Sequence, residues 1–141
     1  DVSLARAALE SAGVRHWGGA SAADRQALHD ALDDYARLSG QAPDPATLTE
    51  AHLRIHRALV GLTGSQRLVA AADALSAEIR LGLAHLDRTR SNIDEQVADH
   101  RRLVGLLDRG LESAALDELS RHLAVAEGSL LAATGHGTIS P

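Results

Sequence analysis

The stretch DPATLTEAHLRIHRALVGLTG, residues 44–64, sets the pattern for the whole chain. Asp44 followed by Pro45 is a typical helix start, because Asp can cap the first turn and Pro has no N–H to leave unpaired there. Thr47 and Glu50 also have capping-box spacing, so the first residue of the helix stays open. Apolar residues then recur at helical spacing until Gly64, namely Leu48, Ile55, Leu59 and Leu62. The stretch therefore predicts an amphipathic helix.

Five further segments show similar spacing, and none shows the strict alternation of a strand. We expect helices at residues 4–17, 21–40, 66–85, 91–110 and around 116–130, with Arg90 as an alternative end of the fourth helix of the chain. The tail 135–141 should be frayed. Ala and Leu dominate the apolar residues and favour helix over strand. The chain should form an all-α, antiparallel bundle of about six helices.

Three local details complete this prediction. The first helix should begin with Leu4, Ala8 and Leu9, which have helical spacing, and run toward Trp17. The second helix should be capped by Ser21 or Asp24 and should end at Gly40, at the position of a left-handed residue. In the same way, Ser91 should cap the fifth helix and Gly110 should end it.

Composition narrows the class of protein. The chain has 141 residues, which suits a single domain spanning 1–141, and it has no Cys for disulfides or thiolate metal sites. All 14 basic residues are Arg, the net charge is −5, and no basic stripe is present that would bind DNA. No segment approaches the roughly 20 apolar residues of a membrane span, and no signal peptide opens the chain. We therefore expect a cytoplasmic protein without membrane contact.

The eight histidines are the unusual feature. His52 and His56 are four residues apart, so both leave one face of their helix. His100 lies between Val97 and Val104, and His122 lies beside Leu119 and Leu123, so both belong to apolar faces. Four inward imidazoles on three helices could each be hydrogen-bonded core residues, or one divalent metal could satisfy all of them. The other four should be surface or capping residues: His16, His29, His85 and His136.

Several ordered motifs carry a family resemblance. They are Arg6 with Leu9-Glu10, then the run from His52 to Leu59 followed by Gly64-Ser65 and Leu68, then Asp99-His100-Arg101, and finally Gly110, Ala114-Ala115 and His122-Leu123. Together they resemble the effector domain of GntR-type transcription regulators of the FadR subfamily, bacterial proteins. The resemblance covers essentially the whole chain.

The resemblance implies a helical bundle with a central cavity for a metal and an effector. The metal ligands would be His52, His56, His100 and His122, and a small organic carboxylate would complete the coordination with help from Arg6 and Ser65. The metal would be a divalent transition ion, with zinc as first choice and nickel, manganese, iron or copper as alternatives. The domain would form a homodimer and would reach operator DNA only through an N-terminal winged-helix domain that this chain does not contain.

Three positions depart from the family pattern. His52 stands where the family usually has Asp, Ser65 where it has Asn, and Ile55 where it often has Phe. Four imidazoles without a carboxylate favour borderline metals over magnesium or calcium and strengthen attraction for an anion. For Arg6 the alternative to a place in the cavity is a surface pair with Glu10, four residues on.

Two other functions stay open. The bundle could be a metal-dependent enzyme, with Glu50 or Asp99 as the general base, or a metal-free helical interaction module. A sensor domain is preferred, because no second inward acid, nucleophile motif or phosphate-binding loop accompanies the histidines. A winged-helix domain encoded upstream would separate the sensor from both alternatives.

Overall fold

The computed structural model describes residues 1–89 and 93–134, and this part of the chain forms α-helices with no strand. The all-α prediction is therefore confirmed. The helices are α1 (Val2–Arg15), α2 (Ala22–Ser39), α3 (Pro45–Gly61), α4 (Gln66–Thr89), α5 (Ile93–Asp108) and α6 (Glu112–Thr134), with the short 3-10 helix η1 (Trp17–Gly19) after α1. The fourth helix thus runs past His85, close to the longer of the two predicted ends. Ser91 and the tail 135–141 lie outside the described residues.

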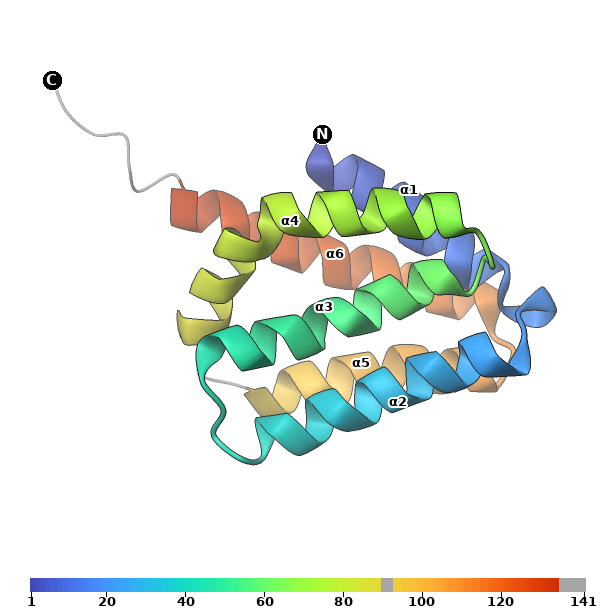
Figure 1. Ribbon diagram of the computed structural model, residues 1–141, viewed down its shortest axis with the longest axis horizontal. Coiled ribbons are helices and arrows are strands. Elements are labelled where there is room, and N and C mark those ends of the chain that lie inside the picture. Colours follow the sequence, from blue (N-terminus) through green and yellow to red (C-terminus); the bar gives the residue numbers. More distant parts are fainter. Residues whose placement is uncertain (90–92, 135–141) are drawn as a thin grey trace, which may run out of the picture.

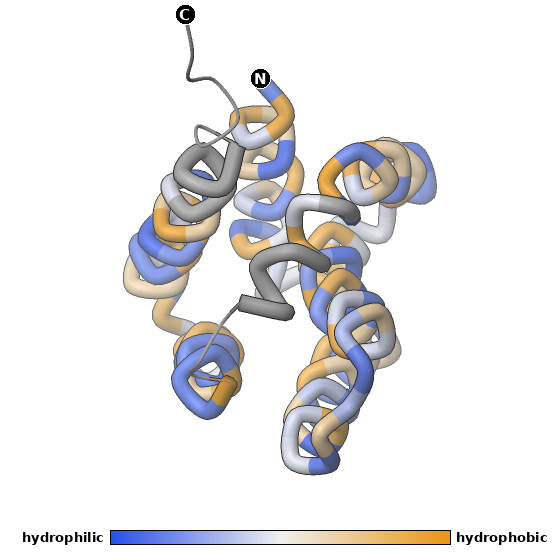
Figure 2. Tube along the Cα trace, turned by 90° about the vertical axis from the view of Figure 1, so that its left-hand side faces the viewer, coloured by the Kyte–Doolittle hydropathy of each residue, from blue (hydrophilic) through white to orange (hydrophobic). Residues whose placement is uncertain are grey.

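Helix α3 occupies the middle of the bundle (Figure 1). It packs against α1, α2 and α4, whereas α5 packs against α2 and α6, and α6 also contacts α1 and α4. Successive helices run in opposite directions, as the short connections predict (Figure 1). Figure 2, turned by 90°, shows apolar and polar residues following one another within each turn of the helices. This pattern is typical of helices that bury one face. None of the helices in the described part of the chain has the length and apolarity needed to cross a membrane.

The start of α3 follows the Asp-Pro signature. Asp44 is the N-cap, and its carboxylate accepts the backbone N–H of Thr47 at 3.1 Å and the Thr47 hydroxyl at 2.7 Å. Pro45 takes the first helical position, so the alternative capping box from Thr47 to Glu50 is not the start. Ser21 caps α2 in the same manner by accepting the N–H of Asp24. Local capping chemistry therefore fixes where both helices begin.

The predicted left-handed residue at Gly40 is wrong. Gly40 has φ −79°, and the positive φ falls on Ala42 instead, at 47°. The reason is that α2 ends in a tight turn, in which the N–H of Gln41 donates to the carbonyl of Leu38 at 3.0 Å. This turn satisfies a terminal carbonyl without a left-handed residue at Gly40. Gly110, in contrast, has the positive φ expected of a helix terminator, at 69°.

Helix α1 forms where Leu4, Ala8 and Leu9 predict it, but these residues do not mark its buried face. Leu4 is 74% exposed and Ala8 is exposed, while the buried residues of α1 are Arg6, Glu10, Gly13 and Val14. Helix α1 carries small residues of its own, mainly Ala and Ser, on every side. The spacing of its apolar residues therefore indicates only weakly which side is buried. Close packing decides instead, since a Cβ at Gly13 would lie 1.8 Å from the carbonyl oxygen of Leu59 on α3. Helix α1 therefore turns Arg6 and Glu10 inward.

The main core is aliphatic and joins α2, α3, α5 and α6. Its fully buried members surround one aromatic ring, that of Tyr35. They include Leu28, Ile55, Leu59, Leu107 and Leu119. Because this single cluster draws on helices from both halves of the sequence, it holds the bundle together around the histidines described next.

Candidate metal centre

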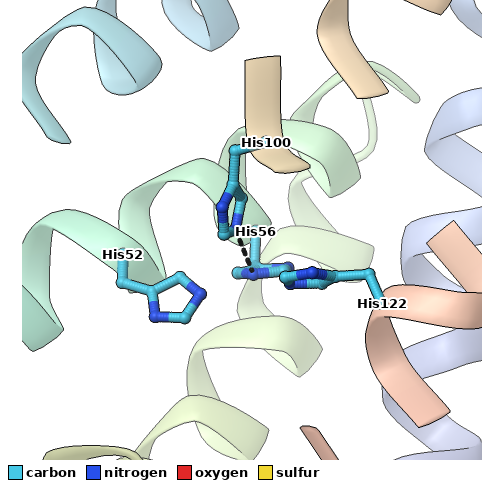
Figure 3. A group of neighbouring side chains, drawn as sticks. All are labelled: His52, His56, His100 and His122. Carbon is cyan, nitrogen blue, oxygen red and sulfur yellow. Dashed lines mark hydrogen bonds between the residues drawn. The ribbon is translucent and has the colours of Figure 1, made fainter. Parts of the chain in front are cut away.

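Three helices bring four histidines together in the interior. His52 and His56 project from α3, His100 from α5 and His122 from α6, and none is more than 8% exposed (Figure 3). One ligand nitrogen from each ring can be chosen so that all four lie within 4.8 Å of one another. The prediction that these rings converge is confirmed, and the convergence follows from their apolar neighbours, which turn each helix toward the core.

A hydrogen bond to the backbone sets which nitrogen of His100 carries the hydrogen. The Nδ1 of His100 lies 2.6 Å from the backbone carbonyl of Gln96, which can only accept. Nδ1 therefore carries the hydrogen in neutral His100, and its Nε2 presents a lone pair. That Nε2 faces the Nε2 of His56 at 3.5 Å, the contact drawn in Figure 3. The two nitrogens thus point at the same small volume.

This arrangement fits a transition metal. Nitrogens bound to one ion at about 2.0–2.1 Å with a tetrahedral angle lie about 3.4 Å apart. The 3.5 Å between His56 and His100 matches that spacing, and the 4.8 Å limit for the whole set requires only small movements of the other rings. Neutral imidazole is a good ligand for zinc, copper, iron and nickel. Tyr35 packs against His52 and His100, with ring centroids 5.4 Å away in each case, and so forms one wall.

A buried carboxylate, that of Glu10, completes the surroundings of the histidines, although its spacing from Arg6 suits a surface pair. Glu10 is 2% exposed; one oxygen accepts the Nε–H of Arg6 at 2.8 Å, and the other lies 3.0 Å from the Nδ1 of His56. The sequence showed only its four-residue spacing from Arg6, which is also the spacing of an ordinary surface ion pair. Arg6 thus pairs with Glu10 as the alternative expectation had it, but in the interior and not at the surface, and its role toward an effector stays a prediction.

Burial controls the ionisation here. Desolvation lowers the pKa of His56 well below its usual 6.5, and the charge of Arg6 and the three neighbouring imidazoles add to the effect. Desolvation also raises the pKa of Glu10, against the opposing influence of Arg6. His56 is therefore a neutral imidazole around neutral pH, which is the form that binds metals.

The cavities beside this cluster are small. One of about 10 Å³ is lined by Arg6, Glu10 and His56, and another of about 20 Å³ touches Arg6 at the α1–α6 contact. The first holds about one water molecule. A larger hollow of about 500 Å³ is an open groove between α2, α3 and the start of α4, and the four histidines do not line it. The cavities that Arg6 lines, one of which also touches His56, therefore have room for little more than a water molecule.

The remaining candidates lie elsewhere. Ser65 caps α4, where its hydroxyl accepts the N–H of Leu68 at 3.2 Å, nine residues beyond His56. Glu50 is exposed and pairs with Arg80 at 2.6 Å, and Asp99 joins an ion-pair network with two arginines of α5 and α6. The structure does not bring any of the three to the histidine cluster, and the effector role of Ser65 stays a prediction.

The other histidines match their expected roles where they are described. His16 is exposed and follows α1 as its C-cap. His29 is half-buried on α2 and bonds to Asp108 at 2.9 Å. The side chain of His85 and all of His136 lie outside the described residues.

A helical bundle that gathers four imidazoles in its interior belongs to the class of all-α domains with a candidate metal centre. Comparison with known families identifies it further, because the family model of the FCD domain matches residues 1–125. The chain therefore belongs to the FCD domain family, the C-terminal effector-binding domain of GntR/FadR-type regulators, and the resemblance drawn from the motifs is confirmed. Searches of curated proteins and of solved structures find no match.

Proposed function

We propose that this chain is a metal-dependent sensor domain, in which His52, His56, His100 and His122 hold one divalent transition ion, zinc by first choice. The observation that carries the proposal is the convergence of four buried imidazoles from three helices within 4.8 Å. Each neutral imidazole has one donor and one acceptor nitrogen, so four rings gathered in an apolar interior bring four lone pairs out of bulk water. A cation satisfies the lone pairs of all four.

The charges favour an anionic effector. Four neutral imidazoles add no negative charge to a divalent ion, and the charges of Arg6 and Glu10 offset each other. The positive charge of the ion would therefore stay uncompensated in a buried site unless an anion bound beside it. A small organic carboxylate suits this role, because it can bind an open coordination position of the metal. Arg6, whose guanidinium suits a carboxylate, also lines both neighbouring cavities. Once bound, the metal ion would act as a Lewis acid toward a carboxylate oxygen of the effector.

The small cavities suggest how sensing works. A carboxylate larger than a water molecule can enter only if side chains or helices around Arg6 and His56 move apart. An effector that binds the opened arrangement better than the closed one shifts the population toward it. In a homodimer whose subunits each carry a winged-helix domain, that shift would alter the grip on operator DNA. Catalysis has less support, since Glu50 and Asp99 are both engaged in ion pairs away from the histidines.

The metal content of untagged protein, measured by mass spectrometry, tests this function. The wild-type chain and a His16→Ala control, changed at an exposed residue, should each retain about one transition-metal ion, and His100→Ala should lose it. Equal metal content in all three, or no uptake of added zinc or nickel by the wild type, would contradict the proposal. On the loaded protein, titration with mono- and dicarboxylates should then change the fluorescence of Trp17 in a saturable manner, and the metal-free protein should not respond.

A further inference from the structure

The buried carboxylate of Glu10 lies against one of the four histidines and has no place among the proposed ligands. We infer that Glu10 is a positioning residue of the metal centre, which holds the Nδ1–H of His56 so that its Nε2 faces the other three rings. The inference rests on the proposed metal function and adds to it a residue from α1, a helix that contributes no ligand.

The two oxygens of Glu10 have separate partners. Oε1 accepts the Nε–H of Arg6 at 2.8 Å, and Oε2 lies 3.0 Å from the Nδ1 of His56. All three side chains are at least about nine-tenths buried, so water does not compete for these contacts. The contact with Arg6 favours the ionised carboxylate, and it also restricts rotation of the carboxylate away from the ring.

This contact fixes which nitrogen of His56 is free. A carboxylate only accepts hydrogen bonds, so Nδ1 must donate and the lone pair must be on Nε2. That nitrogen is the one 3.5 Å from the Nε2 of His100. His100 is held in the same tautomer by the carbonyl of Gln96, at 2.6 Å. Two rings from different helices are thus set by independent acceptors to aim the same nitrogen at the same point.

Charge gives the second argument. Among metal-binding histidines, a carboxylate on the outer nitrogen orients the ring and increases its basicity. Here the four inner ligands are neutral, and the Glu10 carboxylate is the acceptor on the outer nitrogen of one of them, while Arg6 offsets its charge. An Arg–Glu pair with only a packing role would not need its second oxygen directed at an imidazole across the α1–α3 contact. Gly13, one turn further along α1, permits that close contact.

Cobalt(II) is a suitable probe, because its visible absorption reports the geometry and the donor strength of its ligands. We would measure Co²⁺ affinity by competition with a chelator, and the absorption spectrum, for the full chain and for Glu10→Gln. The substitution keeps the size of the side chain and removes its charge. Glu118→Gln is the matched control, since Glu118 is also a mostly covered acid paired with arginine, but its partners are Arg102 and Arg121.

We expect Glu10→Gln to bind Co²⁺ about 10- to 100-fold more weakly and to shift the absorption band, whereas Glu118→Gln should match the wild type. Wild-type affinity and spectrum in Glu10→Gln would overturn the inference alone. Absence of Co²⁺ binding in the wild type would instead overturn the proposed function and this inference with it. If circular dichroism shows that metal-free Glu10→Gln is unfolded, Glu10→Asp decides: a weaker and shifted Co²⁺ complex supports the inference, and an unchanged one overturns it.

Discussion

Two histidine–carboxylate contacts of nearly equal length occur in different environments of this molecule. His56 lies 3.0 Å from Glu10 in the interior, and His29 lies 2.9 Å from Asp108 at the surface. Each contact joins two helices, α3 with α1 in one case and α2 with α5 in the other. Their pKa shifts are nevertheless opposite: the pKa of His56 is lowered well below 6.5, and that of His29 is raised above it.

Solvent, and not distance, accounts for the difference. The side chains of His29 and Asp108 are 35% and 45% exposed, so water solvates the imidazolium and the hydrogen bond to Asp108 dominates. The side chains of His56 and Glu10 are 4% and 3% exposed, and desolvation there outweighs the attraction of the carboxylate. The surface contact can therefore serve as an ion pair, whereas the buried one keeps a neutral imidazole available as a ligand.

The largest expected effect comes from removing the counter-charge of the buried contact. Arg6→Ala leaves the Glu10 carboxylate buried without its cation and should cost about 3–5 kcal/mol of unfolding free energy. Asp108→Ala, which removes half of the surface contact, should cost about 1 kcal/mol or less. Urea unfolding of the metal-free proteins measures both. Similar losses in the two variants would show that burial does not separate the contacts as we argue.

A smaller effect tests the close packing of α1 against α3, which brings Glu10 to His56. Gly13→Ala places a methyl group against the carbonyl of Leu59, so α1 must move away from α3, at a cost of about 1–3 kcal/mol. Gly105→Ala is the matched control, since Gly105 is also helical and nothing lies near its missing Cβ. That change should be neutral or stabilise by about 0.5–1 kcal/mol. Thermal unfolding compares them, and a Gly13→Ala chain as stable as the wild type would contradict the close approach of α1.

The same contrast shows how much the sequence could predict. On α3 the histidines are flanked by Ile55 and Leu59, so one apolar period predicts both the helix and the direction of its rings. The same holds for His100 beside Val97 and Val104. Where polar site residues have strongly apolar neighbours on a helix, their burial follows from local pattern.

On α1 that local pattern is missing. Arg6 and Glu10 have the spacing of an ordinary surface ion pair, and of the two leucines near them Leu4 is exposed and Leu9 is only half-buried. Their burial depends on residues remote in sequence, namely the His56 ring and the Leu59 backbone against Gly13. No periodicity within one helix contains that information. For the same reason the small size of the cavity beside Arg6, Glu10 and His56, which depends on how several helices pack, was not predictable.

The smallest expected effect is the pH dependence of the surface contact. Because the folded pKa of His29 is raised above the 6.5 of the unfolded chain, its contact stabilises the fold below pH 6.5 and is lost as the pH rises through the raised value. The difference in melting temperature between the wild type and His29→Gln should therefore be larger at about pH 5.5 than at about pH 8.

The buried contact affects stability with the opposite sign. His56 stays neutral in the folded protein, so only the unfolded chain gains a proton there as the pH falls below 6.5. The metal-free protein therefore loses stability in that range. His29→Gln should thus steepen the acid loss, because it removes the contribution that opposes it. A difference that instead grows toward alkaline pH would show that His29 is not held as an imidazolium by Asp108.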